Sequence, residues 1–141
     1  MIHEEICTYE VCKLAKAKGF QLDCIGYYDF EGEFRFNYES AISNKERTFC
    51  HNKYNNIWHR GLTDAPTQSL LQRWLREEKG VTICVDIFDD GWFFDISTFY
   101  KQDTGIYEVD IPYKSSNVSP VFDTYELALE DALKYALQNL V

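Results

Sequence analysis

Long apolar runs are missing from this sequence, because its uninterrupted apolar stretches are only a few residues long. A transmembrane helix needs about 20 apolar residues in a row, so none is expected. Residues 1–10 are acidic and lack a basic flank followed by an apolar run, so no signal peptide is expected either. Glycine-rich phosphate loops, nucleophile elbows, paired CxxC motifs and kinase signatures are absent as well. The sequence therefore predicts a cytoplasmic protein without a membrane span, a catalytic motif or a cofactor.

Positive charge is also scarce. Asp and Glu number 23 against 14 Lys and Arg, which gives a net charge of −9. Residues 1–40 sum to −4, residues 41–80 to +3 and residues 81–141 to −8. A chain this acidic repels a phosphate backbone, so nucleic acid is an unlikely partner. Solubility is the favoured explanation of this acidity. The alternative is an acidic surface that binds a basic partner, for instance by mimicking nucleic acid.

The cysteines form no disulfide framework or metal motif. Their number is odd and their spacing irregular: Cys7, Cys12, Cys24, Cys50 and Cys84. Without an export signal, reduced thiols are expected. Cys50, His51 and His59 are the nearest approach to a zinc site or an activated nucleophile, but they lack the paired short spacings of zinc ligands. Ordinary loop residues are favoured, and no metal is predicted.

The most readable stretch is 64–86, which predicts a helix that leads directly into a strand. Asp64 is the expected N-cap, and Pro66 is tolerated in the first turn. The apolar residues that follow recur at helical spacing: Leu70, Leu71, Trp74 and Leu75. Gly80 ends the helix, and alternation of apolar and polar residues from Val81 to Ile87 predicts the strand.

The rest of the chain predicts one α+β domain, residues 1–141. Further helices are expected at 8–18 and 124–140, a hairpin at 24–30 and 33–38, and two more strands at 92–100 and 106–113. Residues 39–63 show no sustained period and are expected to be a loop. The predicted order is α-β-β-loop-α-β-β-β-α. It predicts a mostly antiparallel sheet of about five strands, a hairpin plus a three-stranded meander, with three helices packed on one face.

Residues 65–77, APTQSLLQRWLRE, resemble the central motif of small uncharacterised proteins from phages and mobile elements of gut Bacteroidetes. Residues 8–20, TYEVCKLAKAKGF, and residues 119–137, SPVFDTYELALEDALKYAL, are similar to the two ends of proteins in that family. The resemblance covers about half of the chain and includes no catalytic signature. It implies a cytoplasmic setting in an infected or lysogenic cell, and no residue-specific role carries over.

Two surfaces are candidate sites. The first is the only basic region with interleaved aromatic residues, and its candidate ligand-binding residues are Arg47, Tyr54, Trp58, His59 and Arg60. Aromatic rings stack on bases and Arg holds phosphate, so a nucleotide-like anion would suit it. The alternative is that the aromatic residues pin the loop to the core while the charges are solvated.

The second candidate is a protein-contact surface at Asp89, Asp90, Trp92 and Phe93. Residues 92–94 are consecutive aromatics in a strand, so at least one must project from the opposite face. An exposed aromatic beside acids is typical of protein contacts. The carboxylates of residues 86–110 could instead hold Mg²⁺ or act as acid and base, but their positions at turns and on a polar strand face favour solvation.

These observations favour a small acidic, non-enzymatic accessory protein of a phage or mobile element. We expect it to act by contacting a host or phage protein, for instance by inhibiting a host factor. The alternative is a nucleotide-binding or sequestering domain that uses residues 47–60. A homo-oligomer in which a second copy covers an exposed sheet face is the third hypothesis.

Overall fold

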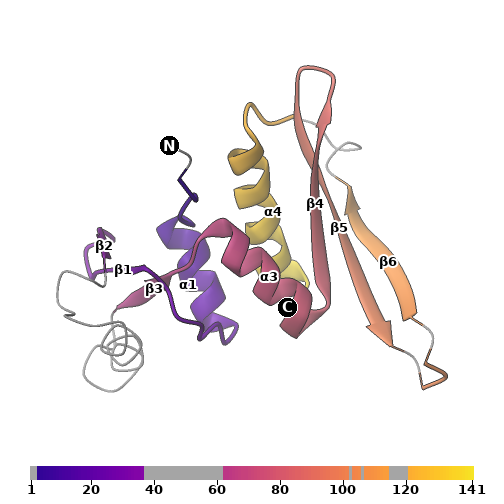
Figure 1. The fold of residues 1–141 in the computed structure, drawn as a ribbon, viewed down its shortest axis with the longest axis horizontal. Coiled ribbons are helices and arrows are strands. Elements are labelled where there is room, and N and C mark those ends of the chain that lie inside the picture. The colour runs from indigo at the N-terminus through magenta and orange to yellow at the C-terminus, as the bar shows by residue number, and fades with distance from the viewer. Residues whose placement is uncertain (1–2, 37–61, 102, 106, 115–120) are drawn as a thin grey trace. The chain divides into compact units, whose positions relative to one another are not determined.

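The structure is a computed structural model that describes residues 3–36, 62–101, 103–105, 107–114 and 121–141 (Figure 1). The described residues form three helices and two three-stranded antiparallel sheets. The chain divides into two compact units, residues 1–67 and residues 68–141. None of the described helices is long and apolar enough to cross a membrane.

The first unit contains α1 (Tyr9–Ala17), β1 (Gly26–Tyr28), β2 (Phe34–Phe36) and β3 (Thr63–Ala65). The Thr8 hydroxyl accepts a hydrogen bond from the backbone N–H of Val11 at 3.4 Å and so caps α1. Strand β1 lies between the other two, and α1 packs against β3. A buried set of side chains fills this unit: Cys7, Val11, Cys12, Ala15, Phe20, Leu62 and Ala65.

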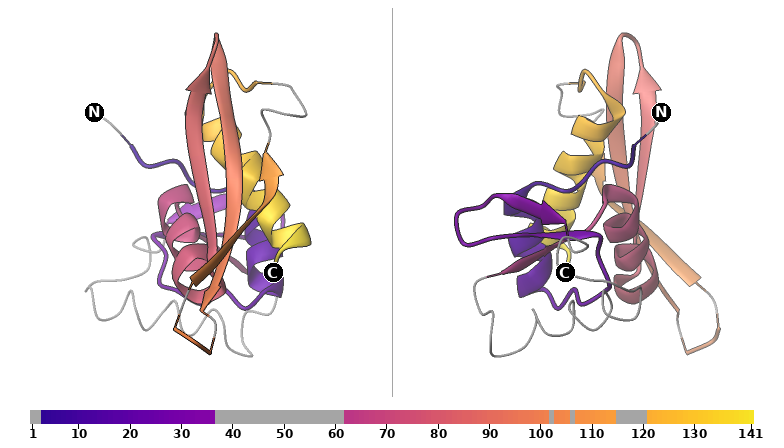
Figure 2. Two further views of the ribbon diagram at one scale, coloured as in Figure 1. Left: turned by 90° about the vertical axis from the view of Figure 1, so that its right-hand side faces the viewer. Right: turned by 60° about the vertical axis from the view of Figure 1, so that its left-hand side comes forward.

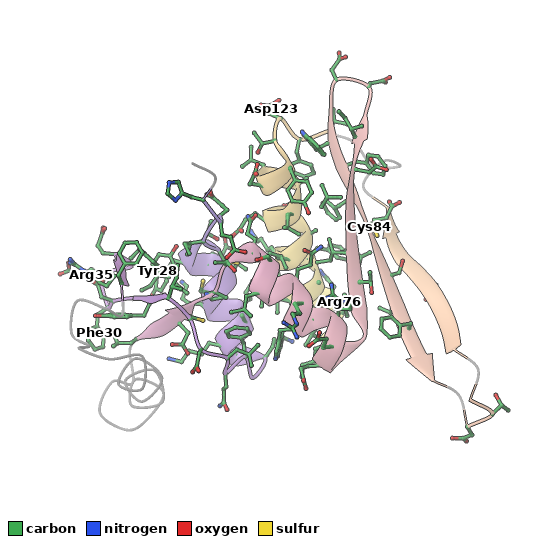
Figure 3. All side chains as sticks on the ribbon, viewed as in Figure 1. Tyr28, Phe30, Arg35, Arg76, Cys84 and Asp123 are labelled. Carbon is green, nitrogen blue, oxygen red and sulfur yellow. The ribbon has the colours of Figure 1, made fainter. Side chains whose placement is uncertain are left out.

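Aromatic rings hold the β1–β2 hairpin to the start of α1. The Tyr9 and Tyr28 ring centroids are 5.3 Å apart, and Tyr28 and Phe34 follow at 5.8 Å. The Tyr28 hydroxyl donates to the carbonyl oxygen of Cys7 at 2.7 Å. The hairpin turns through Gly32, whose φ of 80° suits glycine. Phe30 projects at this turn and is 71% exposed (Figure 3).

The second unit contains α3 (Gln68–Lys79), β4 (Val81–Phe88), β5 (Gly91–Lys101), β6 (Tyr107–Lys114) and α4 (Tyr125–Asn139). Strand β5 is the centre of the sheet, and both helices pack on the sheet and on each other. The Gln68 side chain joins the helices, because its Nε2 donates to the Glu126 carbonyl at 3.0 Å and to the Glu130 carboxylate at 2.8 Å. Both helices lie on the same face of the sheet (Figures 1 and 2).

The core of this unit comes from alternate residues of the strands and from one face of each helix. Its buried members include Leu71, Trp74, Leu75, Val81, Ile83, Phe94, Ile96, Leu129, Leu133 and Leu137. Gly80 connects α3 to β4 with a φ of 66°, and a Cβ there would lie 2.7 Å from the Phe99 carbonyl oxygen. Only glycine fits that close approach with that backbone conformation.

The predicted α+β class is confirmed, and the order of elements roughly matches. The predicted hairpin, the meander and the helix–glycine–strand unit are all present. The strands differ from the prediction in forming two sheets within the described residues, and α1 packs against β3. The prediction of a single domain stays a prediction.

Strand β3 was not predicted, and it corrects the expected role of Asp64. Asp64 lies inside β3 and pairs with Tyr27 of β1, while α3 begins at Gln68. Asp64 is therefore a buried strand residue and does not cap the helix.

Candidate functional site

The β4–β5 hairpin extends past the start of α4 and ends in a tight turn (Figures 1 and 2). Ile87 pairs with Trp92 and Phe88 with Gly91, which leaves Asp89 and Asp90 as the two residues of the turn. Asp89 has a φ of 48°, a conformation that Asp tolerates better than most residues. Both turn residues are exposed. The hairpin therefore presents two carboxylates at its end.

Residues 121–122 run alongside this end of the hairpin. The Trp92 N–H donates to the Phe122 carbonyl at 2.8 Å, and the Phe122 N–H donates to the Trp92 carbonyl at 2.7 Å. A Cβ placed on Gly91 would lie 2.8 Å from the Val121 Cβ and 2.9 Å from the Phe122 carbonyl oxygen. Glycine at position 91 thus permits a backbone approach that a side chain would block.

Aromatic contacts extend the connection to the start of α4. The Trp92 and Tyr125 ring centroids are 5.5 Å apart in an edge-to-face arrangement with an interplanar angle of 88°. Phe94 and Phe122 lie 5.9 Å apart beneath them, and Phe94 is fully buried. Trp92 thus sits between its cross-strand neighbour Ile87 and Tyr125.

The apolar side chains assembled here are exposed. Ile87 is 61% exposed and Tyr125 36%, and Trp92 is partly exposed between them. We call Ile87, Trp92 and Tyr125 the tip surface. Its members come from two segments that are about thirty residues apart in the sequence and are held together by the Trp92–Phe122 hydrogen bonds. Val121, 41% exposed, lies against Gly91, which alternates to the opposite sheet face from Trp92.

Carboxylates border the tip surface on both segments. Asp89 and Asp90 are exposed at the hairpin turn, Asp86 is exposed on the opposite sheet face, and Asp123 and Glu126 are exposed at the start of α4, where Figure 3 labels Asp123. The Asp86 carboxylate accepts from the Ile87 N–H at 2.7 Å. At α4 the Thr124 hydroxyl accepts from the Leu127 N–H at 3.1 Å and caps the helix.

The structure brings all four predicted protein-contact residues to the end of one hairpin. Asp89 and Asp90 form the turn, and Trp92 points to the same face as the buried Phe94. Phe93 pairs with Asp86 on the opposite sheet face and is partly exposed, as expected for consecutive aromatics in a strand. Their role in protein contact stays a prediction.

Sequence reasoning missed Ile87 and Tyr125 as part of this surface. Ile87 continues the apolar alternation of a strand, so its pattern predicts burial rather than exposure. Tyr125 reaches Trp92 only through the pairing of residues 92 and 122. A single bridge of this kind leaves no periodic signal in the sequence.

The candidate ligand-binding residues lie outside the described residues: Arg47, Tyr54, Trp58, His59 and Arg60. The same is true of Cys50 and His51, so the nucleotide hypothesis for residues 47–60 stays a prediction. Within the part of the chain that the structure describes, no three His, Cys, Asp or Glu side chains are grouped to hold a metal ion.

Among the residues that the structure describes, two ionisable groups outside the tip surface have shifted pKa values. The pKa of the Cys24 thiol is raised well above its usual value, mainly because the thiol is buried. The negative charge of the nearby Asp64 raises this pKa further. The backbone N–H of Glu33 is the main cause that lowers the pKa of Asp29, and the N–H of Glu31 and the guanidinium of Arg35 lower it further. Both groups belong to the first unit.

Comparisons of the chain with models of protein families, with curated proteins and with solved structures find no match.

Proposed function

We propose that this chain is a small acidic binding protein that acts through protein–protein contact and not through catalysis. The observation that carries the proposal is the tip surface, where exposed Ile87 and Tyr125 flank Trp92. Single exposed apolar residues are ordinary, but a connected group with an aromatic centre and a polar border has the composition of a protein interface.

The energetics favour a partner that covers this surface. Fully burying a large aliphatic side chain stabilises a protein or complex by about 1.5–3 kcal/mol. Because Ile87 is 61% exposed, a partner that covers it could still gain more than half of that free energy. Tryptophan and tyrosine are the residue types most often found to dominate binding energy in interfaces. The hydrogen bonds between Trp92 and Phe122 fix the two segments, so a partner would meet a preformed surface.

A more specific role is part of the same proposal. The resemblance of residues 65–77 to phage and mobile-element proteins supports an accessory protein that contacts a host or phage protein and, in the simplest case, inhibits it. A cytoplasmic setting follows from the same resemblance.

Affinity capture with a matched pair of variants tests the proposal. The immobilised protein is incubated with a bacterial lysate and compared with Ile87→Asp, which places a charge in the tip surface. Leu22→Asp is the control, because Leu22 is 41% exposed and belongs to the first unit. Circular dichroism confirms that both variants are folded.

We expect proteins that bind the wild type and the Leu22 variant but not the Ile87 variant. Equal capture by all three would contradict the proposal that the tip surface makes the contact.

A further inference from the structure

We infer that the tip surface binds a basic amphipathic segment of another protein, which carries large apolar side chains on one face and Lys or Arg on the other. The inference rests on the proposed function and adds the chemistry of the partner. It comes from the charges around the apolar side chains, which the proposed function does not use.

The two segments that build the tip surface carry charge of only one sign. Residues 81–95 contain four acids, and residues 121–133 contain another four. Neither range contains a Lys or an Arg, and the first basic residue of α4 is Lys134. The acids of the hairpin turn and of the start of α4 are exposed: Asp89, Asp90, Asp123 and Glu126. An apolar side chain that docks here therefore brings its neighbours close to carboxylates.

The positive end of the α4 dipole does not cancel this charge. A helix N-terminus is equivalent to about half a positive charge and acts only over the first turn. Asp123 and Glu126 carry two full negative charges at the same place, and the Thr124 hydroxyl already accepts one of the free N–H groups. The start of α4 therefore stays negative, as does the hairpin turn.

Charge also decides between occupants. A nucleic acid or an anionic membrane would bring negative charge to a negative surface, and two copies meeting through this same surface would oppose their own carboxylates. A segment that carries apolar and basic side chains satisfies both parts of the surface. Its apolar residues cover Ile87, Trp92 and Tyr125, while its cations meet the surrounding acids.

Synthetic peptides about 14 residues long, roughly four helical turns, test the inference. The first peptide places Leu on one helical face and Lys on the other. The second keeps the Leu face but replaces Lys by Glu, and the third keeps the Lys residues but replaces Leu by Ser. Each is labelled with fluorescein, and binding to the full chain is followed by fluorescence anisotropy at about 50 mM and about 300 mM salt.

We expect binding of the Lys/Leu peptide only, weakened by the higher salt because exposed charges are screened. Ile87→Ser should weaken it about tenfold, because most of one large apolar contact is lost. The matched control Leu22→Ser removes an exposed apolar side chain of the first unit and should change binding less than about twofold.

A second pair of variants tests the charges without touching the apolar centre. Asp89→Asn/Asp90→Asn should weaken binding roughly two- to thirtyfold, the range expected for two exposed ion pairs. Asn also tolerates the positive φ of residue 89. Glu4→Gln/Glu5→Gln changes the net charge by the same amount at exposed positions of the first unit. Binding by this control should stay within about twofold of the wild type.

Equal binding of the Glu/Leu or the Lys/Ser peptide would overturn the inference, as would equal losses in the two charge variants or no binding of any peptide. Self-association that Ile87→Ser abolishes would overturn it in favour of a second copy. If capture from lysate still depends on Ile87 in any of these cases, only the partner chemistry is wrong. If capture is independent of Ile87, the proposed function fails as well.

Discussion

Replacing Gly91 by alanine tests how closely the hairpin approaches residues 121–122. The new Cβ would lie 2.8 Å from the Val121 Cβ and 2.9 Å from the Phe122 carbonyl oxygen, so something must shift. The oxygen belongs to the backbone, and its movement threatens the two hydrogen bonds between Trp92 and Phe122. The substitution therefore acts on the junction that builds the tip surface.

The protein can respond to the new methyl group in two ways, and the response that costs less free energy sets the expected loss of stability. Keeping the junction means tolerating overpacking, which costs about 1–3 kcal/mol. Opening it loses two backbone hydrogen bonds, each worth about 0.5–1.5 kcal/mol net. In both cases, replacing glycine by alanine also restricts the unfolded chain, which stabilises the folded protein by about 0.4–1 kcal/mol. The free energy of unfolding should therefore fall by roughly 1.3 kcal/mol at the middle of these ranges, and by at most about 2.6 kcal/mol.

Urea denaturation followed by circular dichroism measures this loss, and hydrogen exchange of the Trp92 and Phe122 amides shows whether the junction opens. Gly105→Ala is the control. Its Cβ meets no atom within 4 Å, so only the φ of 82° opposes it, and the exchange of these two amides should not change. A Gly91→Ala protein that is as stable as the wild type, with both amides still protected, would refute the close approach.

Three further predictions concern the rest of the chain. The carboxylate of Asp29 has a pKa below its usual 3.8, so it stabilises the folded state above that pH, and the contribution is lost as the pH falls toward the lower folded value. Asp29→Asn should therefore flatten the acid limb of a pH–stability curve, and an unchanged acid limb would contradict this. Among the cysteines that the structure describes, the exposed Cys84 should react first with a thiol reagent at pH 8. Cys24, whose raised pKa keeps it a thiol, should lag, and mass spectrometry showing the reverse order would contradict the assignment. Leu133→Ala should lower the free energy of unfolding by about 2–5 kcal/mol, because Leu133 is fully buried, and a loss below about 1 kcal/mol in urea denaturation would place it outside the core.

The regular elements of this fold could be predicted because their patterns are local. The apolar spacing around Trp74, the glycine at position 80 and the alternation from Val81 to Ile87 indicate a helix, a stop and a strand without reference to anything distant. Strand β3 could not be predicted in this way, because its three residues show no period and are held by pairing with β1. Once residues 63–65 become a strand, Asp64 cannot cap the helix.

The candidate site shows the same limit. The hairpin residues from Asp89 to Phe93 can be recognised in the sequence, because an acidic turn is followed directly by aromatic residues. The partners across the junction, Phe122 and Tyr125, depend on a contact between distant segments that no sequence period records. Exposure of Ile87 is likewise a tertiary property, because its place in the strand pattern predicts burial.

The most direct measurement is amide shift mapping by ¹H–¹⁵N NMR while the unlabelled Lys/Leu peptide is titrated into the labelled full chain. The central claim is that contact is made through the tip surface, so the shifts should concentrate in residues 86–93 and 121–127 and should disappear in Ile87→Ser. Shifts concentrated in residues 3–36 or 39–63, with the hairpin end unchanged, would contradict it.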